Sequence, residues 1–292
     1  MGKKFSKPEM SRRINGDLPS ASQEIVETPK RRFDMILLER YPEYSRATIQ
    51  KFIKKGLATI NDEVINKANY LVDFEQEEFC KITPPEGEKE RPPVIYEDEN
   101  IIVFNKPIGM LSIKKGAYLA ETAIDDFGEI VHRLDRDTSG VVIVAKNEKV
   151  KSYLQKQFAE RKTHKTYYAV VVGHPATPHA VINVPLTRNL KRPTTFIPDP
   201  NGREAITEYN VIAKNDRFSL VELKPRTGRT HQLRIHMAHI GTPILGDPVY
   251  NPKSPKADRM YLHAASLEIT IPEGKRVTFT APLPENFRDA VK

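Results

Sequence analysis

The sequence contains a single cysteine, Cys80, among its 292 residues. One thiol cannot form a disulfide within the chain, and it cannot supply a cysteine cluster for a metal. Low cysteine content of this kind is typical of a reducing compartment. We therefore expect a cytoplasmic protein, and its 39% of hydrophobic residues is enough to build a sizeable core.

Long hydrophobic runs are also missing. No stretch reaches the roughly 18 apolar residues that a transmembrane helix needs. The first residues, Met1 to Lys7, are polar and lead into no apolar segment, so they do not have the form of a signal peptide. The sequence therefore predicts no membrane partner.

Positive charge, in contrast, is in excess. Lysine and arginine total 46 against 38 acidic residues, which gives a formal net charge of +8. This excess suits a polyanionic partner, because basic side chains that neutralise phosphates release counterions. Its meaning depends on where the charges lie.

Two polar segments divide the chain. Residues 1–30 are basic and poor in aromatic residues, which predicts a disordered tail. This tail could be an RNA-contacting arm or a terminal segment with no role. Residues 84–93 contain four prolines and several charges, a composition that cannot form a core and predicts a linker. We therefore expect a small domain over residues 31–83 and a large domain over residues 94–292.

The small domain contains the pattern of an amphipathic helix. Ser45 and Gly56 have the residue types of an N-cap and of the position after a C-cap. Between them, Ile49, Phe52 and Ile53 fall on one arc at about 100° per residue. The other arc carries the basic residues Arg46, Lys51, Lys54 and Lys55. The pattern predicts a helix that buries one face and offers a basic one, and the alternative is a solvated face with no ligand.

The large domain has many short strand patterns and few helices. Strand patterns occur at residues 94–96, 101–104, 141–145, 167–172, 205–212, 219–224, 266–271 and 276–281. Helical spacing occurs over residues 150–158 and 229–240. Residues 185–204 form a basic loop or loose hairpin, which suits a phosphate backbone. The composition predicts an α+β domain on a mixed, mostly antiparallel sheet.

The most informative stretch runs from Val131 to Gly140 and reads Val-His-Arg-Leu-Asp-Arg-Asp-Thr-Ser-Gly. It places Asp135 on a turn before a strand-like segment, with Arg133 and Arg136 beside it. Neighbouring positive charge keeps a carboxylate ionised. Such a group can act as a nucleophile or base toward an electrophilic carbon. Spacing alone favours the alternative, a turn aspartate that caps its own backbone.

This stretch resembles the His-Arg-Leu-Asp-x-x-Thr-Ser-Gly signature of the RluA-type pseudouridine synthases. Two further motifs of that family follow in order, Lys165 to Ala169 (Lys-Thr-Tyr-Tyr-Ala) and Thr227 to His236 (Thr-Gly-Arg-Thr-His-Gln-Leu-Arg-Ile-His). The segment Asn105 to Gly109 is similar to the opening of the family's catalytic domain. The resemblance covers residues 94–290 and implies a pseudouridine synthase-like fold.

The small domain resembles the RNA-binding module named after ribosomal protein S-four. It has that module's Ser-Arg pair at Ser45 and Arg46, and its Lys-x-Gly-x-x-x-x-Asn run ends at Asn61. Asp62 stands where the family usually has glycine. The hairpin therefore lacks its preferred turn residue, and a negative charge enters the expected RNA face.

The resemblance implies isomerisation of uridine in RNA. The bond from the base nitrogen to the ribose is broken, and carbon 5 of uracil is joined to the sugar instead. Nothing is oxidised and no group comes from outside, so no cofactor is expected. Asp135 is the expected catalytic residue, either attacking the sugar or removing a sugar proton. Arg234 matches the arginine that pairs with this carboxylate, and Tyr167 matches the tyrosine that stacks on the base and helps to remove the carbon 5 proton.

A stacked uridine has to be flipped out to reach a buried carboxylate. Arg133 could fill the gap left behind, and Leu262 could form part of an apolar wall. Tyr168 competes with Tyr167 for the family's tyrosine, but alternation along a strand puts them on opposite faces. We interpret His132 as a buried structural imidazole.

Three histidines, His231, His236 and His239, suggest the alternative of a metal site. His236 and His239 have helical spacing, but no cysteine or glutamate stands near them at ligand spacing, which leaves only Asp247 as an additional ligand. We therefore expect no metal.

Two other functions are alternatives to a pseudouridine synthase. A non-catalytic RNA-binding or ribosome-assembly protein would need none of Asp135, Tyr167 and Arg234. A glycosidase-like hydrolase would need a second carboxylate, and Asp137 is too close in sequence to face Asp135 reliably. The favoured prediction is a monomeric pseudouridine synthase whose partner is RNA. Large-subunit ribosomal RNA is favoured as the substrate by analogy with family members that carry a separate RNA-binding module of the S-four type.

Overall fold

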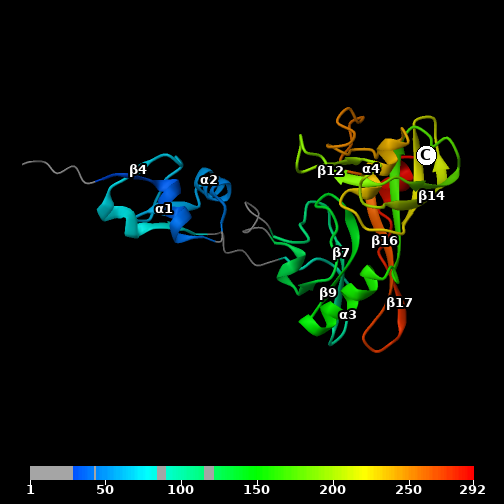
Figure 1. The fold of residues 1–292 in the computed structure, drawn as a ribbon, viewed down its shortest axis with the longest axis horizontal. Coiled ribbons are helices and arrows are strands. Elements are labelled where there is room, and N and C mark those ends of the chain that lie inside the picture. The colour runs from blue at the N-terminus through cyan, green and yellow to red at the C-terminus, as the bar shows by residue number, and fades with distance from the viewer. Residues whose placement is uncertain (1–28, 43, 84–89, 115–121) are drawn as a thin grey trace, which may run out of the picture. The chain divides into compact units, whose positions relative to one another are not determined.

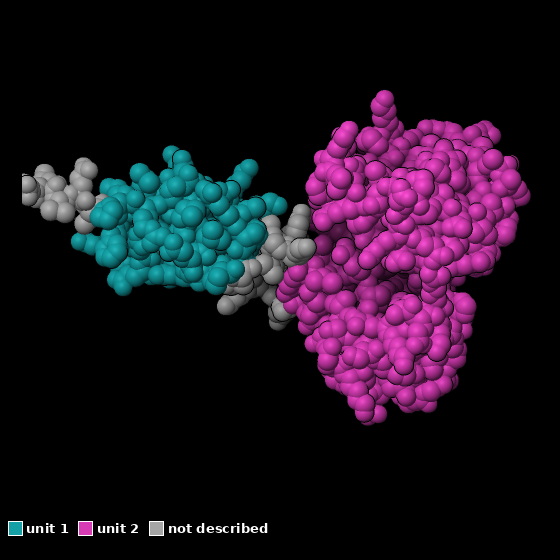
Figure 2. Space-filling view, viewed as in Figure 1, with its two compact units in different colours: residues 1–83 teal, residues 84–292 magenta. Residues whose placement is uncertain are grey.

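The computed structural model describes residues 29–42, 44–83, 90–114 and 122–292. Contacts divide the chain into two compact units, residues 1–83 and 84–292 (Figure 2). Residues 1–28 of the predicted tail and residues 84–89 of the predicted linker lie outside the described part. Within that part, no helix is both long and apolar enough to span a membrane.

The first unit combines helices with short strands. Its described elements are β1 (Arg31–Arg32), α1 (Phe33–Arg40), α2 (Arg46–Lys54), β2 (Ala58–Ile60), β3 (Glu63–Val64), β4 (Leu71–Val72), the 3-10 helix η1 (Phe74–Phe79) and β5 (Cys80–Ile82). The strands β3, β2 and β5 form an antiparallel sheet in that order, and β1 pairs with β4.

The boundaries of α2 are those that the sequence predicts. The Oγ of Ser45 accepts a hydrogen bond from the backbone N–H of Thr48, which satisfies one of the free donors of the first turn. Gly56 follows the C-cap with a φ of +73°. The side chains of Ile49, Phe52 and Ile53 are buried, so the predicted apolar face is confirmed.

Asp34 on α1 joins the two helices. Its fully buried carboxylate accepts hydrogen bonds from Arg32, from Arg46 at 3.1 Å and from Gln50 at 2.8 Å. Burial opposes ionisation, but these hydrogen bonds outweigh it and lower the pKa of Asp34. Arg46 therefore stabilises this unit in addition to lying on the basic face of α2.

The β2–β3 turn has its tight conformation although Asp62 stands at the position where glycine was expected. Asn61 and Asp62 have φ values of +50° and +67°, the left-handed pair that a type I′ turn requires. Lys81 lies 2.5 Å from the Asp62 carboxylate. The negative charge that Asp62 brings to this face is therefore paired with a cation of the same unit.

The second unit is built on one large sheet (Figure 1). Its described elements are β6 (Val94–Glu97), β7 (Ile101–Lys106), the 3-10 helix η3 (Ile124–Asp126), β8 (Glu129–Ile130), β9 (Ser139–Ala145), α3 (Glu148–Ala159), β10 (His164–Val172), β11 (His179–Asn183), β12 (Leu186–Arg188), β13 (Phe196–Pro198), β14 (Ile206–Lys214), β15 (Phe218–Pro225), α4 (Gln232–His239), β16 (Leu262–Thr270), β17 (Arg276–Thr280) and α5 (Glu285–Asp289). The sheet has the order β11-β14-β15-β10-β16-β9-β7-β6, with β17 paired to β16 and β8 to β9. Its pairs are antiparallel apart from β9 with β16, which confirms the predicted α+β class with a mixed, mostly antiparallel sheet.

The parallel pair of β9 and β16 joins the two halves of this sheet. Ser139 and Gly140 stand opposite His263 and Ala264. A Cβ on Gly140 would lie 2.1 Å from the carbonyl oxygen of Ala264, and the φ of Gly140 is +114°. Only a glycine lets the two backbones come this close with that conformation.

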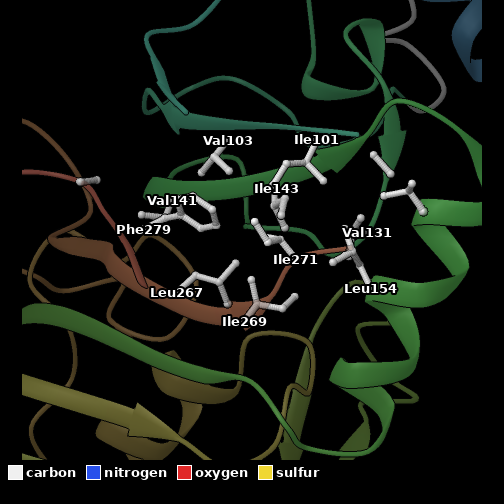
Figure 3. Packing of buried hydrophobic residues seen from close by; sticks show 13 residues of the cluster. Ile101, Val103, Val131, Val141, Ile143, Leu154, Leu267, Ile269, Ile271 and Phe279 are labelled. Atoms are coloured by element: carbon white, nitrogen blue, oxygen red, sulfur yellow. The ribbon is translucent and has the colours of Figure 1, made fainter. Parts of the chain in front are cut away.

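Side chains are buried on both faces of β7 and β9. On one face, Ile101, Val103, Val141 and Ile143 point toward side chains from β16 and from α3, including Leu154 (Figure 3). On the other face, a second cluster includes Ile102, Phe104, Val142, Val144 and Leu134. Leu134 belongs to the segment that precedes β9, so this cluster also holds the signature stretch against the sheet.

Two predicted elements begin elsewhere than expected. The helix predicted from Arg229 begins at Gln232, because the Gln232 side chain accepts hydrogen bonds from Thr227 Oγ1 at 2.8 Å and Arg229 N at 2.9 Å and holds the preceding loop in a non-helical form. The strand predicted from Ser266 begins at Leu262 and has an irregular register opposite Thr166 and Tyr167. The basic segment 185–204 is a loose hairpin of β12 and β13, one of the two forms expected.

The contact at Gly140 predicts a large loss of stability for Gly140→Ala. The new methyl group would collide with the backbone of β16, so we expect the second unit to lose about 4 kcal/mol or more of unfolding free energy. Gly274→Ala is the matched control, because Gly274 also has a positive φ of +81° but nothing within 4 Å of a Cβ. It should cost only about 1 kcal/mol of backbone strain. Thermal unfolding followed by circular dichroism measures both, and equal losses would contradict the role given to close packing.

Candidate active site

A cavity of about 510 Å³ lies in the second unit where the sequence motifs meet. Its described wall comes from the signature stretch, from the region between the end of α3 and β10, and from the loop leading into α4. Residues from these segments include Asp135, Tyr167 and Arg234, and Leu262 on β16 completes the wall. Asp135 is the only carboxylate among the described residues that line the cavity.

The sheet topology explains why distant motifs meet. Tyr167 on β10 and Gly140 on β9 both stand opposite Ala264 on β16, one on each side. The signature stretch ends at the start of β9, so Asp135 reaches the same part of the sheet as Tyr167. The loop that leads into α4 follows β15, which pairs with the other edge of β10.

Lys106 holds the signature stretch to the segment that resembles the family's opening motif. Its buried amine donates to the carbonyl oxygens of Pro107 at 2.9 Å, Met110 at 2.7 Å and Arg136 at 3.0 Å. Nearby, the Oγ of Ser112 donates to the carbonyl of Leu134 and accepts from its N–H. These bonds fix the backbone on both sides of Asp135.

Arg234 lies between two carboxylates. Its Nε and Nη2 donate to the two oxygens of Asp247 at 2.8 and 2.9 Å, and its Nη1 donates to Asp135 Oδ2 at 3.1 Å. The predicted pairing with Asp135 is present, but the two-pronged contact goes to Asp247, which the sequence suggested only as a possible metal ligand. Burial opposes the charge of Arg234, yet the two carboxylates outweigh it and raise its pKa.

A second group beside Asp135, after Arg234, comes from the start of α4. Arg136 donates from Nε to the carbonyl of Gly109 at 2.9 Å, and no contact joins Asp135 to Arg133 in the described residues. His231 supplies the second basic group, with Nε2 3.7 Å from Asp135 Oδ2.

Tyr250 contacts both Arg234 and His231, and no motif in the sequence pointed to it. Its hydroxyl contacts His231 Nδ1 at 2.9 Å and accepts from the N–H of Phe196 at 3.0 Å. The Arg234 guanidinium lies 5.2 Å from the centre of its ring. Burial lowers the pKa of His231, which favours a neutral imidazole.

The two neighbouring tyrosines have different surroundings. Tyr167 lines the cavity, whereas Tyr168 packs with Tyr261 and Phe287 on the opposite side of the sheet. This is the separation that strand alternation predicts. Burial, and then the charge of Asp135, raise the pKa of Tyr167, so its phenol is neutral at ordinary pH. Leu262 is almost fully buried and lines the cavity beside it.

The structure also shows where the other residues singled out in the sequence lie. Arg133 is exposed at the cavity. His132 Nε2 accepts from the N–H of Ile143 at 3.2 Å, and burial lowers its pKa to about 3, which agrees with the predicted structural imidazole. In the first unit, the side chains of Lys51, Lys54 and Lys55 are exposed on α2.

The histidines that suggested a metal site have protein partners. His236 is buried with Nδ1 2.9 Å from Thr207 Oγ1 and Nε2 3.0 Å from the carbonyl of Val184. Asp247 is occupied by Arg234. Over the described ranges, no three histidine, cysteine or acidic side chains are grouped as metal ligands.

Comparisons with known proteins fit this geometry. A family model described as RNA pseudouridylate synthase matches residues 100–239, and an S4 domain model matches residues 31–77. The chain is 32% identical over 288 residues to a Bacillus subtilis protein described as an uncharacterized RNA pseudouridine synthase, covering 91% of this chain and 95% of that one. It is 31% identical to ribosomal large subunit pseudouridine synthase D of Escherichia coli, covering 89% and 90% of the two chains. The solved structure of human RNA pseudouridylate synthase domain containing 1 is similar with a TM-score of 0.59 and 28% identity, covering 68% of this chain and 86% of that one.

The contact between Arg234 and Asp247 predicts a specific effect of Asp247→Asn. The substitution leaves a buried guanidinium with one carboxylate instead of two, so we expect a loss of about 3 kcal/mol. Burial opposes ionisation of Asp247, but Arg234 outweighs it and lowers the pKa of that carboxyl. A lowered pKa means that the stabilisation is present above the unfolded-state value and is lost as the pH falls through the folded-state value.

The difference in melting temperature between the native protein and Asp247→Asn should therefore be largest near pH 7 and shrink below about pH 4. Calorimetric scans between pH 7 and pH 3 test this. A difference that stays constant across the range would contradict the ion-pair explanation.

Proposed function

Because the chain belongs to the RNA pseudouridine synthase family and is an isomerase that acts on RNA, we propose that it uses Asp135, without a cofactor, to convert specific uridines of large-subunit ribosomal RNA to pseudouridine. The observation that carries this proposal is the position of Asp135, the only acid among the described residues that line the cavity, held there by Arg234 at 3.1 Å. A hydrolase with paired carboxylates finds no second acid in this lining.

The reaction needs one ionised carboxylate beside the ribose. In the proposed cycle the bond between N1 of uracil and C1′ breaks, the detached base turns, and C5 forms the new bond to C1′. The hydrogen on C5 leaves as a proton and N1 gains one, so atoms balance without another reactant. Asp135 either attacks C1′ or removes a proton from the sugar, and the fixed guanidinium of Arg234 suits both roles.

Tyr167 and Leu262 form the proposed contact surface for the base. The aromatic ring offers a face on which uracil can stack, and the leucine offers an apolar surface with no competing hydrogen bond. A phenol with a raised pKa is a poor base, so we assign Tyr167 to stacking and to holding the base while it turns. Removal of the C5 proton then falls to another group or to water.

Arg133 is placed to assist entry of the uridine. It is exposed at the cavity and has no protein partner among the described residues, so its guanidinium is available to the RNA. We propose that it occupies the gap left in the stack when the uridine is flipped out.

Three observations favour ribosomal RNA. The Escherichia coli relative is named a ribosomal large subunit pseudouridine synthase, and the S4 domain match adds an RNA-binding module. The formal net charge of +8 suits a highly charged RNA. We propose that the protein acts on this RNA as a monomer in the cytoplasm, with the exposed lysines of α2 contacting the backbone.

Asp135→Asn tests the chemistry directly. The substitution preserves the shape of the side chain but removes its charge and nucleophilicity, so pseudouridine formation should fall to background. RNA binding should stay within about twofold, because it rests on cations in both units. The assay is pseudouridine formation on unmodified large-subunit ribosomal RNA, with a filter-binding measurement on the same preparations. Near-native turnover by a folded Asp135→Asn protein would refute the proposed mechanism.

Lys54→Glu tests the first unit. Lys54 is exposed on α2, and reversal of its charge should weaken RNA binding about tenfold and make the dependence of affinity on salt shallower by about one unit. Lys67→Glu, an exposed lysine on the segment between β3 and β4, is the charge-matched control and should change affinity less. Equal effects of the two variants would show that total charge, rather than the α2 face, determines binding.

A further inference from the structure

The cavity wall contains cations with and without protein partners. Its arginines and lysine are Arg133, Arg161, Lys165, Arg226, Arg229 and Arg234. Arg161 pairs with Glu204, Arg226 with Glu208 at 3.2 Å, and Arg229 donates to the carbonyl of Glu204 at 2.9 Å. Arg234 is held by its two aspartates. Within the described residues, this leaves Arg133 and Lys165 without a hydrogen-bond acceptor or an anionic partner.

Lys165 is the less exposed of these two. Its ammonium lies 6.0 Å from the centre of the Phe158 ring, a weak attraction that does not replace an anion. Burial lowers the pKa of Lys165 to about 8, because partial loss of hydration destabilises the charged ammonium. A half-buried ammonium that lines a cavity and has no anionic partner among the described residues points to an anion that the substrate supplies.

The strand places Lys165 at a defined distance from the chemistry. Lys165 and Tyr167 are two residues apart on β10, so their side chains point to the same side, roughly 7 Å apart along the strand. The wall near Tyr167 is the deep end, where Arg234 and Leu262 are buried. The wall near Lys165 is the open end, which includes the exposed residue Ala159.

The backbone of Gly228, another residue of the cavity wall, lies beside the ammonium. A Cβ added to Gly228 would lie 3.8 Å from Lys165 Nζ, its nearest neighbour. Gly228 carries no side chain, so a group from the substrate can reach the ammonium without displacing one. The cation therefore lies next to a part of the cavity wall that carries no side chain.

We propose that Lys165 binds a phosphate of the RNA backbone next to the flipped uridine and thereby positions the ribose over Asp135. This inference rests on the proposed function and adds a substrate-positioning residue to it. The uracil ring fits the deep end, against Tyr167 and Leu262, because it is uncharged and can stack. The phosphodiester is charged and has to lead back to the rest of the RNA, so it lies at the open end, where Lys165 is the unpaired cation beside Tyr167.

The test compares Lys165→Met and Lys165→Arg with the native full-length protein. The substrate is an unmodified transcript of large-subunit ribosomal RNA, and then a synthetic fragment that carries the uridine found to be modified. Removal of the charge should raise KM about 10-fold or more, which corresponds to loss of one charged hydrogen bond, and leave kcat within about threefold. The plot of log kcat/KM against log salt should become shallower by about 0.7. Lys165→Arg keeps the positive charge, so it should retain most of the native KM and most of the native salt dependence.

Substrates in which one phosphate is replaced by an uncharged analogue identify the phosphate that Lys165 contacts. A methylphosphonate placed 5′ or 3′ of the target uridine should cost the native protein about tenfold in kcat/KM at one of the two positions. The same replacement should cost Lys165→Met much less. Lys162→Met is the control, because Lys162 is exposed, pairs with Glu160 at 2.8 Å and does not line the cavity. It should match the native protein in KM and salt dependence.

Two results would overturn the proposal. One is a Lys165→Met protein with native KM and native salt dependence. The other is a loss of kcat with KM unchanged, which would place the amine on the reacting base. If Lys165→Met does not fold, native turnover with both methylphosphonate substrates overturns it as well. Failure of the native protein to form pseudouridine in any transcript would instead refute the proposed function, and transcript binding by the native and Lys165→Met proteins at several salt concentrations then decides whether Lys165 contacts phosphate.

Discussion

The buried guanidinium of Arg234 is the interaction on which the candidate site depends. It joins α4 to Asp247 through two hydrogen bonds and to the signature stretch through Asp135. A charge buried this deeply is stable only with such partners, because the loss of hydration is otherwise not recovered. The contact therefore joins three segments of the chain at once, and the Asp135 carboxylate is oriented by a guanidinium that two other hydrogen bonds hold in place.

Asp247 and Tyr250, which contact Arg234, are themselves held in place by packing and hydrogen bonds. A Cβ on Gly246 would lie 1.9 Å from the carbonyl of Arg259, so the residue before Asp247 has to be glycine, with its φ of +74°. Asp247 Oδ1 also accepts from the N–H groups of Val249 and Tyr250. The ring of Tyr250 then packs on Arg234 and its hydroxyl meets His231. Preorganisation of this kind lets a carboxylate act without rearrangement during the reaction.

The cations around the cavity divide by burial. Arg234 is buried and pairs with Asp135, whereas Arg161 and Arg226 are exposed and pair with glutamates. The described lining of the cavity holds a single acid and several cations, so its electrostatic field favours a polyanion. The parallel contact between β9 and β16 places this arrangement where the two halves of the sheet join.

Much of the fold and the core of the site could be predicted from the sequence. The caps of α2, its apolar face and the strand pattern of the second unit follow from local rules of periodicity and capping, which depend on neighbours in the chain. The separation of Tyr167 from Tyr168 follows from strand alternation. The family resemblance led to Asp135 and Arg234, and the structure brings them to 3.1 Å.

Tertiary structure alone decided which groups meet across the chain. Arg136, the neighbour of Asp135 in the sequence, donates to the Gly109 carbonyl, whereas Arg234 and His231, about 100 residues further along the chain, approach the Asp135 carboxylate. The two-pronged partner of Arg234 is Asp247, 13 residues away, brought there by a glycine conformation that no periodicity encodes. The sequence by itself thus determined most of the elements and the class of fold, since these depend on residue type and local spacing, and the family resemblance of its motifs singled out Asp135. Tertiary structure decided which groups hold the Asp135 carboxylate. It also decided which cations of the cavity have no anionic partner among the described residues, because both depend on distances between segments that are far apart in the chain.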